Sequence, residues 1–289
     1  MQFDKTRIVI RERALLDLLD LALHMVRVHW LPLLVASLVG VAPFVLLNYW
    51  LLADLTFVEE QDYAWYAFRM VLLVLFEAPL AAVPVTLLLG QAMFSERFAV
   101  ARIVRQAIAS LPQLFIYQFL IRGLLMPQAL FWELFERDFT PFMWAYFIAW
   151  FVPFTYWPYI DEVILLERNP LRTGKSGRST WKRSRVLHQG YYGDLFARLM
   201  GCAAIAAALA TALWLASWYA RGLFTQTNDF DSTMYTIYLP VALWIVAAFF
   251  NVVRFLSYLD LRIRREGWEV ELMLRAEADR LARQYQYAG

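Results

Sequence analysis

The sequence predicts an all-α polytopic membrane protein with six transmembrane helices. Its 289 residues are 61% hydrophobic and 17% aromatic, and the mean hydropathy is positive. The apolar residues fall in blocks of about 20 residues or more, the length of helix that crosses a hydrocarbon core of about 30 Å. Basic residues gather in alternate connections between these blocks, as in the cytoplasmic loops of polytopic proteins.

The apolar blocks define the predicted spans and divide the chain into three parts. The spans cover residues 30–53, 66–91, 111–131, 141–160, 195–220 and 236–258. We therefore expect a cytoplasmic interfacial helix at 1–29, a membrane domain at 30–258 and a cytoplasmic C-terminal helix at 259–289.

Charge asymmetry predicts the orientation. Most of the 27 Lys and Arg residues lie in segments 1–29, 92–110, 161–194 and 259–289. The three opposite loops carry only Arg137 and Arg221 but are rich in acids: Asp54, Glu59, Glu60, Asp62, Glu133, Glu136, Asp138, Asp229 and Asp231. Because short basic loops resist translocation, both termini are expected in the cytoplasm.

Amphipathic helices are predicted on the cytoplasmic side before spans one, three and five. Residues 11–28 place polar side chains on one helical face, with leucines opposite: Arg13, Asp17, Asp20, His24 and Arg27. Similar segments precede the third span, "SERFAVARIVRQAIASLP", and the fifth, "SGRSTWKRSRVLHQGYYGDLF". Helices of this kind lie in the membrane interface, so the lipid bilayer is an expected partner.

A carboxylate interrupts the second span, in "LLVLFEAPLAAVP" at residues 72–84. Glu77 in the second span and Arg122 in the third both fall near the predicted bilayer midplane. An unpaired charge at that depth costs at least about 2.5–3.5 kcal/mol, so we expect the two to form an ion pair. The pair could fasten two helices, or it could mark a pathway for an ion, a proton or a lipid head group.

Other basic residues are candidate contacts for lipid head groups. Arg254 lies one helical turn from Asn251 in the inner half of the sixth span, where it could also snorkel to the interface. The largest cytoplasmic loop contributes Arg178, Lys182, Arg183 and Arg185. Attraction to anionic lipid, or the topology signal alone, would account for this loop.

Small residues line one face of the fifth span: Gly201, Ala204, Ala208 and Ala212. Such a stripe allows close helix approach, which predicts either a central helix or a homo-oligomer interface. The segment 259–289 alternates Arg and Glu around a narrow apolar edge, so it could dock on its own bundle or on another membrane or cytoplasmic protein.

Motifs for catalysis, metals and nucleotides are missing from the sequence. His24, His29 and His188 have no ligand spacing around them, and Cys202 is the only cysteine. "GKSGRS" lacks the first glycine of a P-loop, because position 169 is Asn. We therefore expect no enzymatic activity, no cofactor and no nucleic-acid partner.

Two segments carry a resemblance to a known family. These are "VILLERNPLRTGKSGRSTWKRSRVLHQGYYGDLFARLMG" and "YLDLRIRREGWEVELML", within residues 160–275. They resemble six-span bacterial membrane proteins named for the membrane domain of glycerophosphoryl diester phosphodiesterases. The matching motifs are an Arg-Ser pair and a closing Tyr-x-Asp-x-Arg-x-Arg-x-Glu-Gly, here Arg183–Ser184 or Arg178–Ser179, and Tyr258, Asp260, Arg262, Arg264, Glu266 and Gly267. The catalytic barrel of that family is missing, so the resemblance implies membrane architecture without the enzyme.

Two functions follow as hypotheses. The first is a non-enzymatic scaffold or accessory subunit of a membrane complex. The second is a small transporter or lipid-handling protein that uses Glu77 and Arg122. The resemblance and the excess of Arg over Lys favour the bacterial cytoplasmic membrane.

Overall fold

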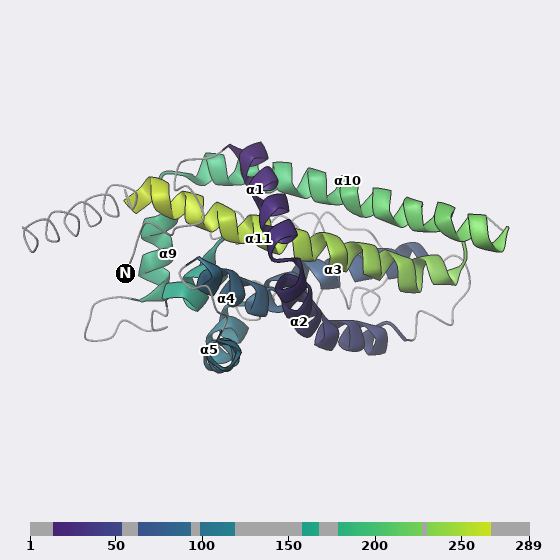
Figure 1. The fold of residues 1–289 in the computed structure, drawn as a ribbon, viewed down its shortest axis with the longest axis horizontal. Helices are drawn as coiled ribbons and strands as arrows, with labels where there is room; N and C mark the ends of the chain where they lie inside the picture. The colour runs from purple at the N-terminus through teal and green to yellow at the C-terminus, as the bar shows by residue number, and fades with distance from the viewer. Residues whose placement is uncertain are drawn as a thin grey trace, which may run out of the picture.

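The computed structural model describes residues 14–53, 63–93, 99–118, 158–167, 179–226 and 230–266. Within these ranges all regular structure is helical, and long helices run along the longest axis of the molecule (Figure 1). The first five helices are α1 (Leu15–Val28), α2 (Trp30–Leu51), α3 (Tyr63–Ala81), α4 (Val83–Ala92) and α5 (Val100–Phe115). They are followed by α8 (Ile160–Glu162), the π-helical turn η6 (Val163–Glu167), α9 (Thr180–His188), α10 (Tyr192–Thr225), the π-helical turn η7 (Met234–Tyr238) and α11 (Leu239–Glu266).

Four helical segments are long and apolar enough to cross a membrane. They are Trp30–Leu51, Tyr63–Ala92, Tyr192–Thr225 and Met234–Arg265, and they correspond to predicted spans one, two, five and six. The all-helical fold and the membrane class are thus confirmed. Most of the predicted spans 111–131 and 141–160 lies outside the described residues, so the number six stays a prediction.

The described part of the predicted N-terminal helix is α1. Its polar residues Asp17, Asp20 and His24 are exposed, as expected for the polar stripe. The opposite face buries Leu18, Ala22 and Met25 against the body of the protein. Figure 1 shows α1 crossing the long helices α10 and α11 rather than running along them.

Helices α3 and α4 form the most buried of the four candidate spans, and α10 is the least buried. Ala204, Ala208 and Ala212 of the small-residue stripe are all exposed, because α10 lies at the edge of the bundle and packs mainly on α11. Among the described helices α10 is therefore not central, contrary to this expectation for the fifth span. Its alternative, a homo-oligomer interface, stays a prediction.

A glycine sets the closest approach between α2 and the junction of α3 with α4. A Cβ added at Gly40 would overlap the carbonyl oxygen of Ala81. This junction lies between Pro79 and Pro84, which cannot donate backbone hydrogen bonds and so weaken the helix there. The packing of α2 on this junction therefore requires a residue without a side chain at position 40.

Replacing Gly40 by Ala is expected to lower the free energy of unfolding by about 1–3 kcal/mol, because α2 must move away from the Ala81 carbonyl. Thermal unfolding in detergent measures the change. Gly193→Ala is the matched control, since a Cβ at Gly193 meets no atom within 4 Å. Removing a helical glycine there should raise stability or leave it unchanged. Equal stability of the two variants would contradict the close packing.

Candidate functional site

A group of nine charged side chains and one tyrosine, here called the polar cluster, joins five helical elements at one end of the bundle. Helix α10 has 34 residues, so it is about 51 Å long and exceeds the hydrocarbon core by some 20 Å. Its first turns lie beside the last turns of α11, and α11 in turn contacts α8, η6 and α9 at this end. The members of the cluster are Asp161, Glu162, Glu167, Arg183, Asp194, Arg198, Arg254, Tyr258, Asp260 and Arg264.

Arg254 of α11 holds two carboxylates of α8. Its Nη2 lies 2.6 Å from Asp161 Oδ2, and its Nε lies 2.8 Å from Glu162 Oε1. Both acids are buried, and the Arg254 side chain is only 20% exposed. Buried carboxylates are costly unless they are paired, so this guanidinium fixes α8 to α11.

Asp260 joins α11 to α10. Arg198 Nη1 lies 2.9 Å from Asp260 Oδ2, and Arg264 Nε lies 3.0 Å from the same oxygen. Arg198 also reaches Asp194 one turn earlier in α10, at 3.1 Å. Asp260 is only 2% exposed and lies between the guanidinium groups of Arg198 and Arg264. Its carboxylate is therefore the buried centre of a row of charges of alternating sign.

Glu167 connects η6 with both α9 and α11. Arg183 donates to its two oxygens from Nε at 2.5 Å and from Nη2 at 3.0 Å. The Tyr258 hydroxyl of α11 donates to Glu167 Oε1 at 2.9 Å. A bidentate guanidinium–carboxylate pair is geometrically specific, which fixes the orientation of α9 on the bundle.

His188, at the end of α9, is fully buried beside this network. Its Nδ1 lies 2.7 Å from the Ser184 carbonyl oxygen, so Nδ1 carries the proton. Its Nε2 accepts a 3.4 Å hydrogen bond from Tyr159 N, and the two rings stack. These partners satisfy a neutral imidazole in the core. Within the described residues, no three His, Cys, Asp or Glu side chains lie where they could hold a metal ion.

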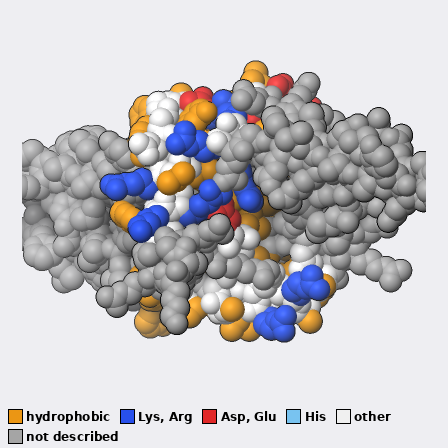
Figure 2. Space-filling model, turned by 90° about the vertical axis from the view of Figure 1, so that its left-hand side faces the viewer, with side chains coloured by type: hydrophobic (Ala, Val, Ile, Leu, Met, Phe, Trp, Pro, Cys, Tyr) orange, Lys and Arg blue, Asp and Glu red, His pale blue; other side chains and the backbone are white. Residues whose placement is uncertain are grey.

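The predicted lipid contacts divide into two groups. Arg254 and Arg183 are held by carboxylates, whereas Lys182 and Arg185 of α9 are exposed. Figure 2 looks onto this end of the molecule, where Lys and Arg side chains gather with Asp or Glu among them. Arg178 lies outside the described residues. Among the described members of this predicted contact, the pair on α9 is thus the exposed part.

Glu77 of α3 is buried and accepts a hydrogen bond from a residue that was not singled out in the sequence. Asn48 Nδ2 of α2 donates to Glu77 Oε2 at 2.8 Å, and the two residues are 1% and 3% exposed. The predicted partner, Arg122, lies outside the described residues. Gln118, one turn before Arg122 in sequence, donates from Nε2 to the carbonyl oxygen of Phe76. The start of the third predicted span therefore approaches the turn that carries Glu77.

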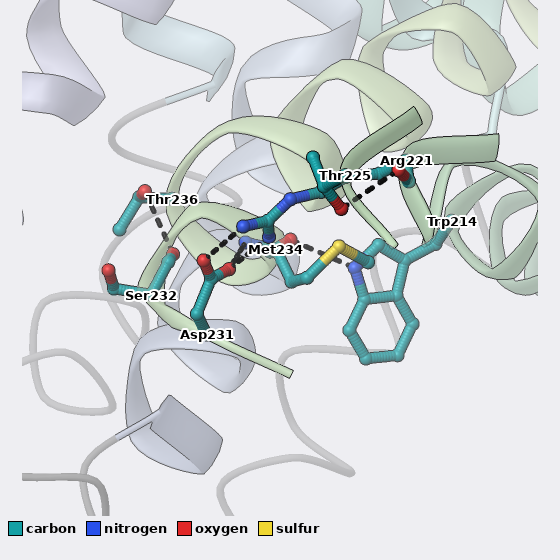
Figure 3. A network of polar contacts seen from close by, with 7 residues as sticks. All are labelled: Trp214, Arg221, Thr225, Asp231, Ser232, Met234 and Thr236. Carbon is teal, nitrogen blue, oxygen red and sulfur yellow. Dashed lines mark hydrogen bonds and ion pairs between the residues drawn. The ribbon is translucent and has the colours of Figure 1, made fainter. Parts of the chain in front are cut away.

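At the opposite end, a group of contacts here called the hairpin clamp joins α10 to residues 230–234 at the start of η7 (Figure 3). Arg221 and Asp231 form a bidentate pair with two contacts of 2.5 Å, and Trp214 Nε1 donates to Met234 O at 2.9 Å. Hydrogen bonds from the Arg221 guanidinium hold the pKa of Asp231 below its ordinary value. Trp218 stacks on Phe230 next to this pair. The clamp closes the short connection between the last two predicted spans.

Sequence reasoning missed the acidic half of the polar cluster. The partner of Asp161 and Glu162 is on α11, and the partners of Glu167 are on α9 and α11, at positions 16 to 93 residues away in sequence. One signal was available: three acids in "IDEVILLE" lie among apolar residues, as does Arg254. Buried charges of opposite sign on different helices are expected to meet.

Arg254→Leu is expected to destabilise the protein by about 3–5 kcal/mol, since it leaves Asp161 and Glu162 buried without this guanidinium. Unfolding in bicelles measures the loss. Lys182→Leu is the control, because Lys182 is exposed on α9 and its removal should change stability by less than about 0.5 kcal/mol. Similar losses in both variants would show that Arg254 has no special role.

The hairpin clamp predicts a pH-dependent stability. The pKa of Asp231 is lower in the folded protein than in the unfolded chain, so its contribution is present above the unfolded value. It is lost as the pH falls through the folded value. Asp231 is partly exposed, so the effect at neutral pH is only about 0–1 kcal/mol. Comparing Tm of the wild type and Asp231→Asn between pH 7 and strong acid should give a difference that disappears at the acid end. A difference that grows with acidification would refute the pairing.

Comparison of the chain with models of protein families, with curated proteins and with solved structures finds no match.

Proposed function

We propose that this chain is a non-enzymatic scaffold or accessory subunit of a membrane complex. In this proposal it has six spans, lies in the bacterial cytoplasmic membrane and keeps both termini and the polar cluster on the cytoplasmic side. The four long apolar helices and the asymmetry of basic residues support this topology.

One observation carries the scaffold proposal: buried charges in the long helices are used for helix-to-helix contacts. Arg254 and Asp260 of α11 and Arg198 of α10 are held by side chains from neighbouring elements. Glu77 is sealed in protein and accepts a hydrogen bond from a neighbouring helix. Charges arranged in this way fix the relative positions of the helices. This use of the charges favours a scaffold over a transporter.

A scaffold also needs surfaces for other molecules. Exposed Lys182 and Arg185 suit anionic head groups or an acidic partner near the inner face. The predicted C-terminal helix, of which residues up to 266 are described, continues from the polar cluster and would carry a partner contact.

A transporter or lipid-handling protein is the second candidate, because of the surroundings of Glu77. Asn48 Oδ1 is buried and has no hydrogen-bond partner among the described residues, although Asn48 Nδ2 binds Glu77. A buried amide oxygen beside a carboxylate could receive a proton donor or a cation. Arg122, if it approaches Glu77 as predicted, would belong to the same site.

Thiol accessibility separates the two functions. Single cysteines at Val74 and Ala81, one turn to either side of Glu77 on α3, are made in a Cys202→Ala background. Both positions are buried, so a scaffold should protect them from a water-soluble maleimide applied from either side. Reaction at either position in the folded protein would favour transport.

Two controls in the same background test the reagent and the topology. Gln226→Cys lies at the end of α10 that carries the hairpin clamp, and Lys182→Cys lies on α9. The proposed orientation predicts labelling of position 226 from the outside and of position 182 only in inverted vesicles. The reverse pattern would overturn the topology without deciding between the two functions.

A further inference from the structure

Helix α5 does not follow the direction of the long helices. Figure 1 looks along the axis of α5, whereas α10 and α11 run across the view. Membrane-spanning helices lie within about 40° of the bilayer normal. If α10 and α11 cross the membrane, α5 must run close to the plane of the membrane.

One face of α5 is fixed to the protein. Ile103 and Leu114 are buried, with α4 and η6 packed beside the helix. Gln113 Nε2 donates to Thr180 Oγ1 at 2.6 Å, which ties α5 to the first turn of α9. The helix is therefore held firmly beside the polar cluster.

A second apolar face of α5 is exposed. Five large side chains recur at spacings of three or four, and so share one side of the helix: Val100, Val104, Ile108, Leu111 and Phe115. Their side chains are 49–66% exposed. The stripe continues past Leu111, where the third span was expected to begin. A stripe of this size suits an apolar environment.

The remaining side of α5 is polar. Arg102 and Arg105 are exposed on this side, and the small residue Ala109 points in a direction between theirs when the helix is viewed along its axis. An apolar face beside a basic face is the pattern of helices that lie in an anionic membrane surface. The bilayer required by the four long helices extends beside α5, which favours lipid over a second protein as the occupant.

We infer that α5 is an in-plane helix whose apolar stripe is covered by lipid acyl chains, with Arg102 and Arg105 at the level of anionic head groups. This inference rests on the proposed topology for the identity of the leaflet, which would be the cytoplasmic one. It assigns to the chain a lipid-binding surface apart from its four long candidate spans and next to the polar cluster.

Two labelled variants test the apolar stripe. Ile108→Cys and Ala109→Cys are made in the Cys202→Ala background, labelled with an environment-sensitive fluorophore and reconstituted in vesicles of phosphatidylcholine and phosphatidylglycerol. These adjacent residues are both exposed but lie on different sides of α5. The label at 108 should emit at shorter wavelength and be quenched by spin-labelled acyl chains, whereas the label at 109 should be quenched by iodide.

Two results would overturn the inference. One is equal quenching of both labels by iodide. The other is a label at position 108 that neither iodide nor spin-labelled acyl chains quench, and that becomes accessible to iodide when the protein is diluted in the vesicles. That result would mean that a second copy of the chain covers the stripe.

Charge is tested separately with the label at 108. Its emission should shift to longer wavelength when phosphatidylglycerol is omitted, and Arg102→Gln/Arg105→Gln should abolish this dependence. No dependence in the parent protein would overturn the head-group assignment. The scaffold proposal fails independently: reactive cysteines at Val74 or Ala81 would overturn it even if position 108 lies in lipid.

Discussion

The fold depends on the neutralisation of charged side chains on the last four turns of α11. Arg254, Tyr258, Asp260 and Arg264 lie on a helix that is otherwise apolar enough to cross a membrane, and each meets a partner from another segment. These partners come from α8, η6 and α10, and Arg183 of α9 shares Glu167 with Tyr258. Because breaking one buried pair leaves a charge without compensation, the five elements are fixed as one unit.

The positions of the other helices depend on where close packing is required. Helices α3 and α4 fill the centre, and α2 reaches their junction through Gly40. Helix α10 is fixed to the bundle mainly by polar residues at its two ends, whereas the small residues in its middle are exposed. This arrangement explains why an alanine-rich helix can lie at the edge of the structure, since its ends are fastened by Asp260 and Asp231.

Periodicity and hydropathy were sufficient to predict the helical membrane class, the four long helices and the exposed polar stripe of α1. They could not predict which helix is central, because an exposed alanine stripe and a buried one have the same sequence. Nor could they pair Arg254 with Asp161 and Glu162, which lie more than 90 positions away in sequence. Glu77 accepts a hydrogen bond from Asn48, which carries no charge and gave no signal of its own. Its predicted partner, Arg122, stays a prediction.

With α5 in the membrane surface, as proposed, the polar cluster and α5 would together link lipid contact and helix packing at the end of the molecule near α9. Gln113 joins α5 to α9, and Arg183 joins α9 to Glu167. A scaffold built in this way would hold its inner surface in a defined orientation to the membrane, which suits the assembly of partners there.

The most direct test of this account is a double-mutant cycle on Arg198 and Asp260, measured by reversible unfolding in bicelles. Arg198→Met, Asp260→Asn and the double variant should show a coupling of at least about 1 kcal/mol, because the pair is buried and its atoms lie 2.9 Å apart. The cycle on Arg264 and Asp194, which are 3.6 Å apart with Asp194 45% exposed, is the control and should give a smaller value. Additivity of the Arg198 and Asp260 changes to within about 0.3–0.5 kcal/mol would contradict the claim that buried ion pairs hold the bundle together.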